Sequence, residues 1–280
     1  MFNKRIIINT NIGCKNNCVY CPQKTIISSY KKISDNTVMS LDVFKKILNN
    51  IPKDYNISFS SFNEPFQNPD TISMILCCVD NGYNVEINTT LVGLNKNIID
   101  VLSNLSLVCF FIHLPNLDDY FMDKTDYLGL LSYTCKHVKN LGFVYFNSLD
   151  YDIKNLVESF GYKIKCGTLN SRCGILFKNQ GYLFGPGFCE MKYDRVQSVL
   201  PDGSVNLCCM DFGLKHIFGN ITRECLLSVY DKNVWKLFKK QQRMFDSDIL
   251  CRNCEFFVQF FSLRYLYYVF KRILDNLGFI

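Results

Sequence analysis

Three cysteines near the amino terminus have the type and spacing of a metal-binding loop. Cys14, Cys18 and Cys21 form a C-x3-C-x2-C pattern bounded by Gly13 and Pro22. Three thiolates on one loop can hold three irons of a [4Fe-4S] cluster and leave the fourth iron open to a small molecule. Zinc is the main alternative, but structural zinc takes four ligands and no His or fourth Cys lies nearby. The loop therefore favours iron–sulfur chemistry.

A second group of cysteines lies in the carboxyl-terminal half. Cys189, Cys208 and the C-x2-C pair Cys251 and Cys254 supply four thiolates from three separated positions. Four thiolates complete the ligand set of a second cluster. Zinc remains an alternative here, because C-x2-C pairs are common zinc ligands. Cys209 directly follows Cys208, and successive strand side chains point to opposite faces, so we expect only one of these two at the site.

Composition limits the class of protein. The chain has 280 residues, 48% of them hydrophobic, which suits one large domain and a smaller one. The net charge of +6 is spread along the chain, so no nucleic-acid partner is expected. The apolar stretch near the amino terminus is too short for a secretory signal. We therefore expect a cytoplasmic location, where fifteen cysteines are thiols and metal ligands rather than disulfides.

Strand and helix patterns alternate before about residue 170. The predicted strands are Arg5–Asn9, Ile57–Ser61, Val85–Thr89, Leu107–His113, Phe143–Asn147 and Lys163–Cys166. The predicted helices are Leu41–Asn50, Thr71–Asp80, Asn95–Leu105, Thr125–Asn140 and Ile153–Phe160, with left-handed stops at Asn81-Gly82, Leu141-Gly142 and Gly161. The alternation indicates an α/β fold with a parallel sheet and a site at the carboxyl ends of its strands.

The first cysteine loop resembles that of the radical S-adenosylmethionine (SAM) enzymes, whose hallmark is C-x3-C-x-aromatic-C after the first strand of a barrel. The resemblance implies a partial (β/α)6 barrel with SAM bound to the open iron. It also implies that one electron, from a donor such as flavodoxin or ferredoxin, cleaves SAM to a 5′-deoxyadenosyl radical that abstracts hydrogen from a substrate. The aromatic residue is Tyr20, which the resemblance places near the adenine.

Other strand ends supply candidate SAM contacts. The stretch from Ser60 to Phe66 resembles the family's Gly-Gly-Glu segment, which implies that Asn63 and Glu64 hold the amino group of SAM, although Phe62-Asn63 replaces the glycine pair. After the third predicted strand, Asn88 and Thr89 are candidates for the ribose or carboxylate. His113 ends the fourth predicted strand, and we expect it to be a core or partly hydrated residue without a chemical role.

The carboxyl-terminal half resembles the SPASM and twitch iron–sulfur extensions of that superfamily. Asp202–Cys208 matches D-G-x-V-x-x-C, and Gly219–Ile221 matches the later Gly-Asn-Ile. A β-hairpin is predicted from Tyr193–Leu200, the turn Pro201–Ser204 and Val205–Cys208, followed by a helix over Leu226–Met244. No cysteine follows Cys254, so the resemblance implies a one-cluster twitch arrangement with Cys208, rather than Cys209, as the ligand.

Arg172 lies just past the sixth predicted strand. Its position resembles that of an Arg facing the substrate hydroxyls in the twitch-type aminocyclitol (2-deoxy-scyllo-inosamine) dehydrogenases and related enzymes of polysaccharide pathways. A fixed cation there would orient a diol and lower the pKa of a hydroxyl. Cys173 beside it is a core residue or a candidate hydrogen-atom donor.

These patterns divide the chain into a radical SAM barrel (1–172), a twitch/SPASM-like auxiliary cluster domain (173–255) and an aromatic carboxyl-terminal helix (256–280). We expect that helix to close the core, with weak contact with a membrane surface as the alternative. The predicted function is oxidation of a carbinol carbon of a sugar, cyclitol or polysaccharide precursor, with an auxiliary [4Fe-4S] cluster as electron acceptor. The alternatives are an epimerase, a peptide-modifying enzyme, and a non-catalytic iron–sulfur or zinc protein.

Overall fold

Six parallel strands form the centre of the fold. The computed structural model describes residues 4–16, 18, 20–116, 122–177, 181–190 and 197–276. The strands are β1 (Lys4–Ile8), β2 (Tyr55–Phe59), β3 (Val85–Thr89), β4 (Cys109–His113), β5 (Leu141–Tyr145) and β6 (Ile164–Cys166). They pair side by side in chain order, which confirms the predicted parallel sheet of an α/β fold.

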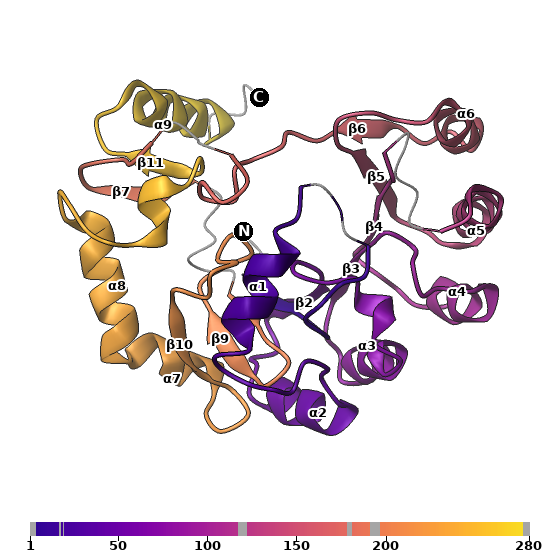
Figure 1. Ribbon diagram of the computed structural model, residues 1–280, viewed down its shortest axis with the longest axis horizontal. Coiled ribbons are helices and arrows are strands. Elements are labelled where there is room, and N and C mark those ends of the chain that lie inside the picture. Colours follow the sequence, from indigo (N-terminus) through magenta and orange to yellow (C-terminus); the bar gives the residue numbers. More distant parts are fainter. Residues whose placement is uncertain are drawn as a thin grey trace.

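Helices cover the outer face of these strands. They are α1 (Gln23–Tyr30), α2 (Leu41–Asn49), α3 (Thr71–Asp80), α4 (Lys96–Ser103), α5 (Lys124–His137) and α6 (Tyr151–Ser159). Figure 1 shows α2 to α6 in an arc outside the sheet. Four of them begin at a Ser, Asn or Asp whose side chain accepts a hydrogen bond from the first turn. The sequence did not predict α1, whose first turn follows Pro22 without any side-chain cap.

Two of the three predicted left-handed stops are present. Gly82 and Gly161 have φ values of +75° and +81° directly after α3 and α6. The stop at Leu141-Gly142 is wrong, because both residues lie in β5 and Asn140 adopts the left-handed conformation instead, with φ +56°. Gly142 has a packing role: a Cβ there would lie 2.5 Å from the ring of Phe111 on the neighbouring strand.

The core lies between the sheet and these helices. Ile6, Ile8, Ile57, Phe59 and Ile87 are fully buried, as expected for strands of a covered parallel sheet. Each such side chain stabilises the fold by roughly 1.5–3 kcal/mol relative to exposure. This packing holds the carboxyl ends of the strands at fixed positions, from which the site loops begin.

Three later strands extend the same sheet beyond β1. They are β8 (Ser198–Val199), β9 (Ser204–Asn206) and β10 (Ile217–Asn220), and the full strand order is β10-β9-β8-β1-β2-β3-β4-β5-β6. Strand β8 is parallel to β1 and antiparallel to β9, so the predicted hairpin is present around Gly203, whose φ is +86°. Residues 193–196 of the predicted hairpin lie outside the described residues. The barrel and the cysteine-rich half therefore share one sheet.

The remaining elements differ from the sequence prediction in two places. They are β7 (Gly187–Cys189), α7 (Leu226–Asp231), α8 (Asn233–Arg243), η3 (Leu250–Asn253), β11 (Phe257–Gln259) and α9 (Leu263–Asn276), while η1 (Pro65–Gln67) follows β2. The single helix predicted over Leu226–Met244 is wrong, because Lys232 is extended and separates α7 from α8. The last helix begins at Leu263 rather than before it, because Phe257–Gln259 pairs with β7.

The described side chains of α9, at residues 263–267, 269 and 270, do not show the buried apolar face expected of a helix that closes the core. Leu263, Leu266, Tyr267 and Phe270 are each more than half exposed. No helix among the described residues is long and apolar enough to cross a membrane.

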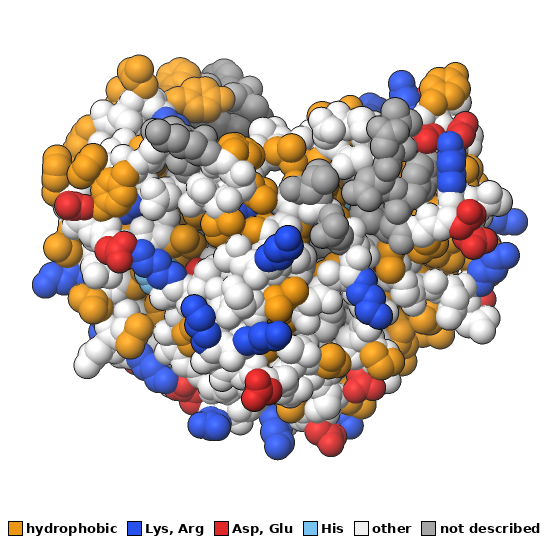
Figure 2. Space-filling model, viewed as in Figure 1, with side chains coloured by type: hydrophobic (Ala, Val, Ile, Leu, Met, Phe, Trp, Pro, Cys, Tyr) orange, Lys and Arg blue, Asp and Glu red, His pale blue; other side chains and the backbone are white. Residues whose placement is uncertain are grey.

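Figure 2 shows Lys and Arg side chains scattered among Asp and Glu on the visible face, rather than gathered into one basic patch.

Candidate functional site

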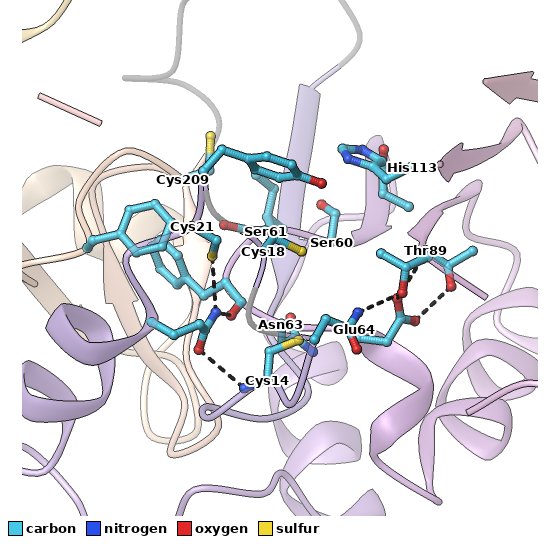
Figure 3. Close-up of a pocket in the computed structure, with 18 of the residues that line it drawn as sticks. Cys14, Cys18, Cys21, Ser60, Ser61, Asn63, Glu64, Thr89, His113 and Cys209 are labelled. Atoms are coloured by element: carbon cyan, nitrogen blue, oxygen red, sulfur yellow. Dashed lines mark hydrogen bonds between the residues drawn. The ribbon is translucent and has the colours of Figure 1, made fainter. Parts of the chain in front are cut away.

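A cavity of about 330 Å³ opens at the carboxyl ends of β1 to β4. The structure brings one group of predicted site residues to its lining: Cys14, Cys18, Tyr20, Cys21, Asn63, Glu64, Asn88, Thr89 and Arg172. Figure 3 shows the three cysteines on one side of this space, with Glu64 and Thr89 across from Cys21. Residues that are distant in sequence thus meet where a parallel sheet places its ligand.

Gln23, the first residue of α1, bridges two of the cysteines. Its Nε2 donates to Cys21 Sγ (3.2 Å) and to the carbonyl of Phe62 (2.7 Å), and its Oε1 accepts from the backbone N–H of Cys14 (3.2 Å). Burial raises the pKa values of the Cys14 and Cys21 thiols, and the Gln23 bond lowers that of Cys21 in part. The arrangement holds the loop with its sulfurs towards the cavity in Figure 3.

A second set of amides ties the loop to the neighbouring strand ends. Gln67 Oε1 accepts from the backbone N–H of Lys15 (3.0 Å), and its Nε2 donates to Asn16 Oδ1 (2.9 Å). Asn16 Nδ2 donates in turn to Thr90 Oγ1 (2.7 Å) after β3. The sequence did not single out Gln23, Gln67 or Asn16, because glutamines and asparagines outside a known motif carry no signal of their partners.

Glu64 lies at the bottom of the cavity and is 2% exposed. Its Oε1 accepts from Thr89 Oγ1 (2.7 Å) and from the backbone N–H of Phe66 (3.3 Å). Its Oε2 accepts from the backbone N–H (2.6 Å) and the hydroxyl (2.7 Å) of Thr90. These bonds occupy about all four lone-pair directions of a carboxylate. Burial raises the pKa of Glu64 to about 7. Glu64 therefore joins the loop after β2 to the end of β3.

The other predicted SAM-binding residues differ in whether their polar groups are already hydrogen-bonded within the protein. The side-chain amide of Asn63 lies 2.8 Å from Thr10 Oγ1 and 2.9 Å from Asn11 Oδ1, so it links the loops after β1 and β2. The hydroxyl of Thr89 donates a hydrogen bond to Glu64, and Asn88 lines the cavity with a partly exposed side chain. The structure thus brings these residues together, and their contacts with SAM stay predictions.

Another part of the cavity wall is formed by aromatic side chains and one cation. Tyr20 packs on Phe146 with ring centroids 4.9 Å apart, and the ring of His113 lies 5.9 Å from that of Phe146. Burial, with the cation of Arg172 nearby, lowers the pKa of His113 to about 4, so its imidazole is neutral at pH 7. Arg172 lies over the ring of Phe212 at 5.6 Å. His113, to which the sequence analysis gave no chemistry, therefore lies in the site; its place at a strand end was the available signal.

A second, smaller cavity is lined by sulfur and aliphatic side chains. Its lining residues are Cys173, Cys189, Leu207, Cys208, Met210, Leu250, Cys251 and Cys254. All four cysteines predicted for the auxiliary site meet here, together with Cys173. A lining of thiols without any carboxylate or imidazole suits an iron–sulfur cluster. Of the two alternatives given for Cys173, the structure supports the core residue, because its buried side chain lines this cavity and not the large one.

Two pairs of adjacent residues form the wall between the cavities. Arg172 and Cys209 line the large cavity, whereas their neighbours Cys173 and Cys208 line the sulfur-rich one. Figure 3 shows Cys209 at the upper left of the large cavity, above Cys21 and away from Cys14. Cys208 and Cys209 thus face different cavities, as expected, but strand alternation is not the reason, because β9 ends at Asn206 and both cysteines lie beyond it. A single peptide bond therefore separates the two environments at each of these places.

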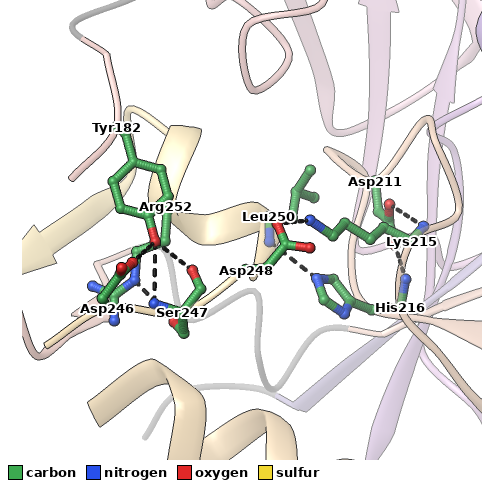
Figure 4. Close-up of polar contacts among 9 residues, drawn as sticks. All are labelled: Tyr182, Asp211, Lys215, His216, Asp246, Ser247, Asp248, Leu250 and Arg252. Atoms are coloured by element: carbon green, nitrogen blue, oxygen red, sulfur yellow. Dashed lines mark hydrogen bonds and ion pairs between the residues drawn. The ribbon is translucent and has the colours of Figure 1, made fainter. Parts of the chain in front are cut away.

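Buried polar groups hold the C-x2-C loop against this wall. Arg252, fully buried, donates to the Ser247 hydroxyl (3.1 Å) and to carbonyls that include those of Met244 (2.7 Å) and Gly185. Figure 4 shows this group beside a second one, in which the Asp211 carboxylate accepts from the backbone N–H groups of Lys215 and His216.

His216 connects the turn after Cys209 to the C-x2-C loop. Its Nε2 accepts from the backbone N–H of Leu250 (3.0 Å), the residue before Cys251. Burial lowers the pKa of His216 to about 4 and raises that of Asp211 to about 6. A neutral imidazole is the form that accepts this hydrogen bond, so the connection is kept at neutral pH.

Comparison with protein families agrees with this geometry. The model of the radical SAM superfamily matches residues 8–140, and the model of the SPASM iron–sulfur cluster-binding domain matches residues 189–255. The chain therefore contains a radical SAM domain followed by an SPASM domain, which confirms the predicted resemblance. These domains imply a SAM-binding [4Fe-4S] cluster, SAM and an auxiliary iron–sulfur cluster. No curated protein matches the sequence.

Solved structures of similar fold include three enzymes of this type. BtrN in complex with AdoMet and 2-DOIA has a TM-score of 0.61 at 19% identity, over 91% of this chain and 94% of that chain. Streptococcus suis SuiB bound to precursor peptide SuiA has a TM-score of 0.62 at 13% identity, over 90% and 70%. Native anSMEcpe with bound AdoMet has a TM-score of 0.56 at 14% identity, over 97% and 98%. At these identities the likeness shows the fold.

Proposed function

We propose that this protein is an oxidoreductase that oxidises a carbinol carbon of a sugar, cyclitol or polysaccharide precursor. The observation that carries the proposal is the wall shared by the two cavities, where Arg172 faces one and Cys173 and Cys208 face the other. BtrN, a twitch-type aminocyclitol dehydrogenase, supports the same class of substrate. When bound, SAM and its cluster supply the 5′-deoxyadenosyl radical that removes the carbinol hydrogen, and the auxiliary cluster supplies an electron acceptor.

Arg172 binds and orients the substrate hydroxyls in this proposal. A guanidinium presents a planar set of donors that suits two neighbouring hydroxyl oxygens, and its charge cannot be lost at physiological pH. The ring of Phe212 (5.6 Å) and the Met210 sulfur (3.6 Å) hold the guanidinium in place. The cation also lowers the pKa of a bound hydroxyl, which prepares that hydroxyl to give up its proton.

His113 accepts that proton in the same proposal. Conversion of a carbinol to a carbonyl removes one hydrogen atom, one electron and the hydroxyl proton, so the site needs a base. His113 is neutral at pH 7, lies on the cavity wall and is held between the rings of Phe111 and Phe146. Its neutral ring nitrogen can therefore accept a hydrogen bond from the hydroxyl beside Arg172 and pass the proton on to water, since its lowered pKa disfavours keeping the proton.

The test is product analysis after anaerobic reconstitution with sugars, cyclitols and aminocyclitols. We expect one ketone and one 5′-deoxyadenosine per SAM consumed, without solvent deuterium on the product carbon. The double substitution Cys251→Ala and Cys254→Ala should keep SAM cleavage and lose ketone formation, because only the auxiliary ligands are removed. Cys225→Ala, at an exposed cysteine, is the matched control. Ketone formation by the double variant at the control rate would refute the electron-acceptor role.

Epimerisation is the second candidate, and the position of Cys209 favours it. Its thiol lines the substrate cavity and could return a hydrogen atom to a carbon radical. The resulting thiyl radical would need one electron and one proton, supplied through a flavodoxin- or ferredoxin-type donor. In heavy water an epimerase would place deuterium on the inverted carbon, and Cys209→Ala would abolish the label. That result would replace the dehydrogenase assignment and leave the radical SAM chemistry in place.

Peptide modification is the alternative that SuiB suggests, since that protein was crystallised with a precursor peptide. At 13% identity, the similarity to SuiB supports a common fold and does not identify a substrate. Peptides belong in the same product screen, and 5′-deoxyadenosine formation that depends on a peptide would favour this alternative. A chain that holds iron but cleaves no SAM under reduction would instead be a non-catalytic iron–sulfur protein.

A further inference from the structure

The auxiliary site contains one thiol more than four irons require. Within the described residues, Cys173, Cys189, Cys208, Cys251 and Cys254 all line the sulfur-rich cavity. The SPASM match begins at residue 189 and so includes the last four, whereas Cys173 precedes it. A cubane cluster takes one cysteine per iron. The fifth thiol therefore needs a role other than completing the ligand set.

The backbone that carries Cys173 is held in an uncommon conformation. Arg172 and Cys173 both have positive φ values, +50° and +57°, which cost energy for residues other than glycine. Hydrogen bonds fix the turn: the backbone N–H of Ser171 donates to Glu255 Oε1 (2.6 Å), and that of Gly174 donates to Ser171 Oγ (2.8 Å). Because Glu255 follows the C-x2-C pair directly, these bonds fasten the strained turn to the cluster loop.

This turn directs Cys173 into the cavity that the four predicted ligands line. Cys173 and Cys254 both line this small cavity and are 9% and 7% exposed, so water competes little for hydrogen bonds between its sulfurs. Arg172, the preceding residue, points into the substrate cavity. The strained turn thus places a cation on one side of the wall and a thiol on the other.

We propose that Cys173 donates an S–H···S hydrogen bond to a ligand sulfur of the auxiliary cluster and thereby raises the reduction potential of that cluster. Reduction adds negative charge to the cluster and its thiolates, and a donor aimed at a ligand sulfur stabilises that charge. Cys173 is therefore a positioning and tuning residue and not a fifth ligand. The inference goes beyond the proposed function, since it holds whether the substrate is oxidised or epimerised.

The test compares Cys173→Ala, Cys173→Ser and the exposed control Cys225→Ala in the full chain after anaerobic reconstitution. Two quantities are measured without substrate: iron per chain, and the midpoint potential of each cluster followed by electron paramagnetic resonance. Added SAM identifies the signal of the cluster with the open iron. We expect unchanged iron in all three variants, a lower auxiliary potential in Cys173→Ala, and a smaller decrease in Cys173→Ser, whose hydroxyl keeps a donor.

Two results would overturn the inference. Loss of about four irons in both Cys173 variants, the content of one cubane, would make Cys173 a ligand. An auxiliary potential equal to that of Cys225→Ala, with full iron content, would show that the hydrogen bond has no effect. Circular dichroism of each variant checks that the fold is kept, and Cys173→Ser serves if the alanine variant unfolds. Failure of ketone formation would leave these measurements unaffected.

Discussion

Side chains other than cysteine hold the iron–sulfur loop in its shape. Gln23 joins Cys14 to Cys21, and Asn16 joins the same loop to Thr90 after β3. Each of these buried amides uses both its oxygen and its nitrogen, so loss of one leaves a partner unsatisfied at a cost of about 1–3 kcal/mol. The individual residues therefore serve two purposes: sulfurs bind iron, and amides fix where the sulfurs lie.

Removal of the first three cysteines tests the loop directly. Cys14, Cys18 and Cys21 replaced together by Ala should lower the iron content after anaerobic reconstitution from about eight to about four, as two cubane sites imply. SAM cleavage should be lost, because no open iron remains. Iron analysis and 5′-deoxyadenosine measurement check this, with Cys225→Ala as control. An unchanged iron content would remove the assignment of this loop.

Glu64 lies at the junction of two site loops, and its substitution should lower the affinity for SAM. Glu64→Gln replaces one acceptor oxygen by an amide nitrogen that faces N–H and O–H donors of Thr90 or Thr89. Because the four hydrogen bonds of Glu64 hold these two loops in place, we expect their displacement to lower SAM affinity by about 1–3 kcal/mol, the cost of leaving a buried polar group unsatisfied. Equilibrium dialysis of the reconstituted protein measures it, and unaltered affinity would place Glu64 outside the SAM site.

Glu64 should also make stability depend on pH in the cluster-free protein. Burial raises its pKa from 4.5 to about 7, so between these values the folded state holds a proton that the unfolded state has released. The contribution of Glu64 to the free energy of unfolding is therefore fully present below pH 4.5. It is lost as pH rises through 7, by on the order of 3 kcal/mol. His113 and His216, with lowered pKa values, act in the opposite direction.

Comparison with Glu64→Gln isolates the carboxyl group from those histidines. The difference in free energy of unfolding between the two proteins, measured by urea at several pH values, should change between pH 5 and 8 in the direction given above. A difference that stays constant over this range would show that Glu64 ionises normally in the folded state.

At the scale of elements, loops after the strands position the site through close backbone contacts. Gly93, between β3 and α4, has φ +87°, and a Cβ there would lie 2.3 Å from the carbonyl oxygen of Phe66. Phe66 belongs to η1, directly after Glu64. The loop after β3 and the loop after β2 are therefore packed backbone to backbone, which only glycine permits at this position.

Gly93→Ala should consequently destabilise the fold more than a left-handed glycine elsewhere. We expect a decrease in the free energy of unfolding of roughly 2–4 kcal/mol, from backbone strain together with overpacking. Gly82→Ala is the matched control, because Gly82 has φ +75° and nothing within 4 Å of an added Cβ. Its expected cost is about 1 kcal/mol, from strain alone. Urea unfolding measures both, and equal costs would contradict the packing argument.

For the whole molecule, the continuous sheet makes the barrel and the cysteine-rich half depend on each other. Asn9, fully buried at the end of β1, donates through Nδ2 to Ser198 Oγ (2.6 Å) and to the carbonyl of Val199 (2.9 Å). Its Oδ1 accepts from the backbone N–H of Phe62 (2.9 Å). One side chain thus connects β1, β8 and the loop after β2.

Asn9→Ala should destabilise the barrel and the cysteine-rich half together. Loss of these buried hydrogen bonds should lower the free energy of unfolding by roughly 2–4 kcal/mol, with unfolding still in one transition. Asn49→Ala, the same change on the exposed face of α2, should stay within about 0.5 kcal/mol. Urea unfolding followed by far-ultraviolet circular dichroism and by tryptophan fluorescence checks this, since the one tryptophan, Trp235, lies in α8. Two separated transitions would contradict the shared sheet.

Local pattern in the sequence determined the parallel sheet, most helices, the hairpin and the first cysteine loop. These features depend on residues close together in the chain: β-branched runs, capping side chains, turn residues and cysteines three or four positions apart. The same reasoning misplaced the stop at Leu141-Gly142 and joined α7 to α8. Gly142 instead lies in β5 beside the ring of Phe111, and Lys232 is extended, with its Nζ bound to Glu224 (2.5 Å).

Tertiary structure alone decided which side chains share a cavity. Cys173 faces the auxiliary site and Cys209 the substrate cavity, although each lies beside a residue of the opposite site. His113 meets Arg172 only because β4 ends near the turn that follows β6. The physical reason is that a side chain's direction depends on the backbone torsions of its own residue, and long-range hydrogen bonds such as Ser171 to Glu255 set those torsions.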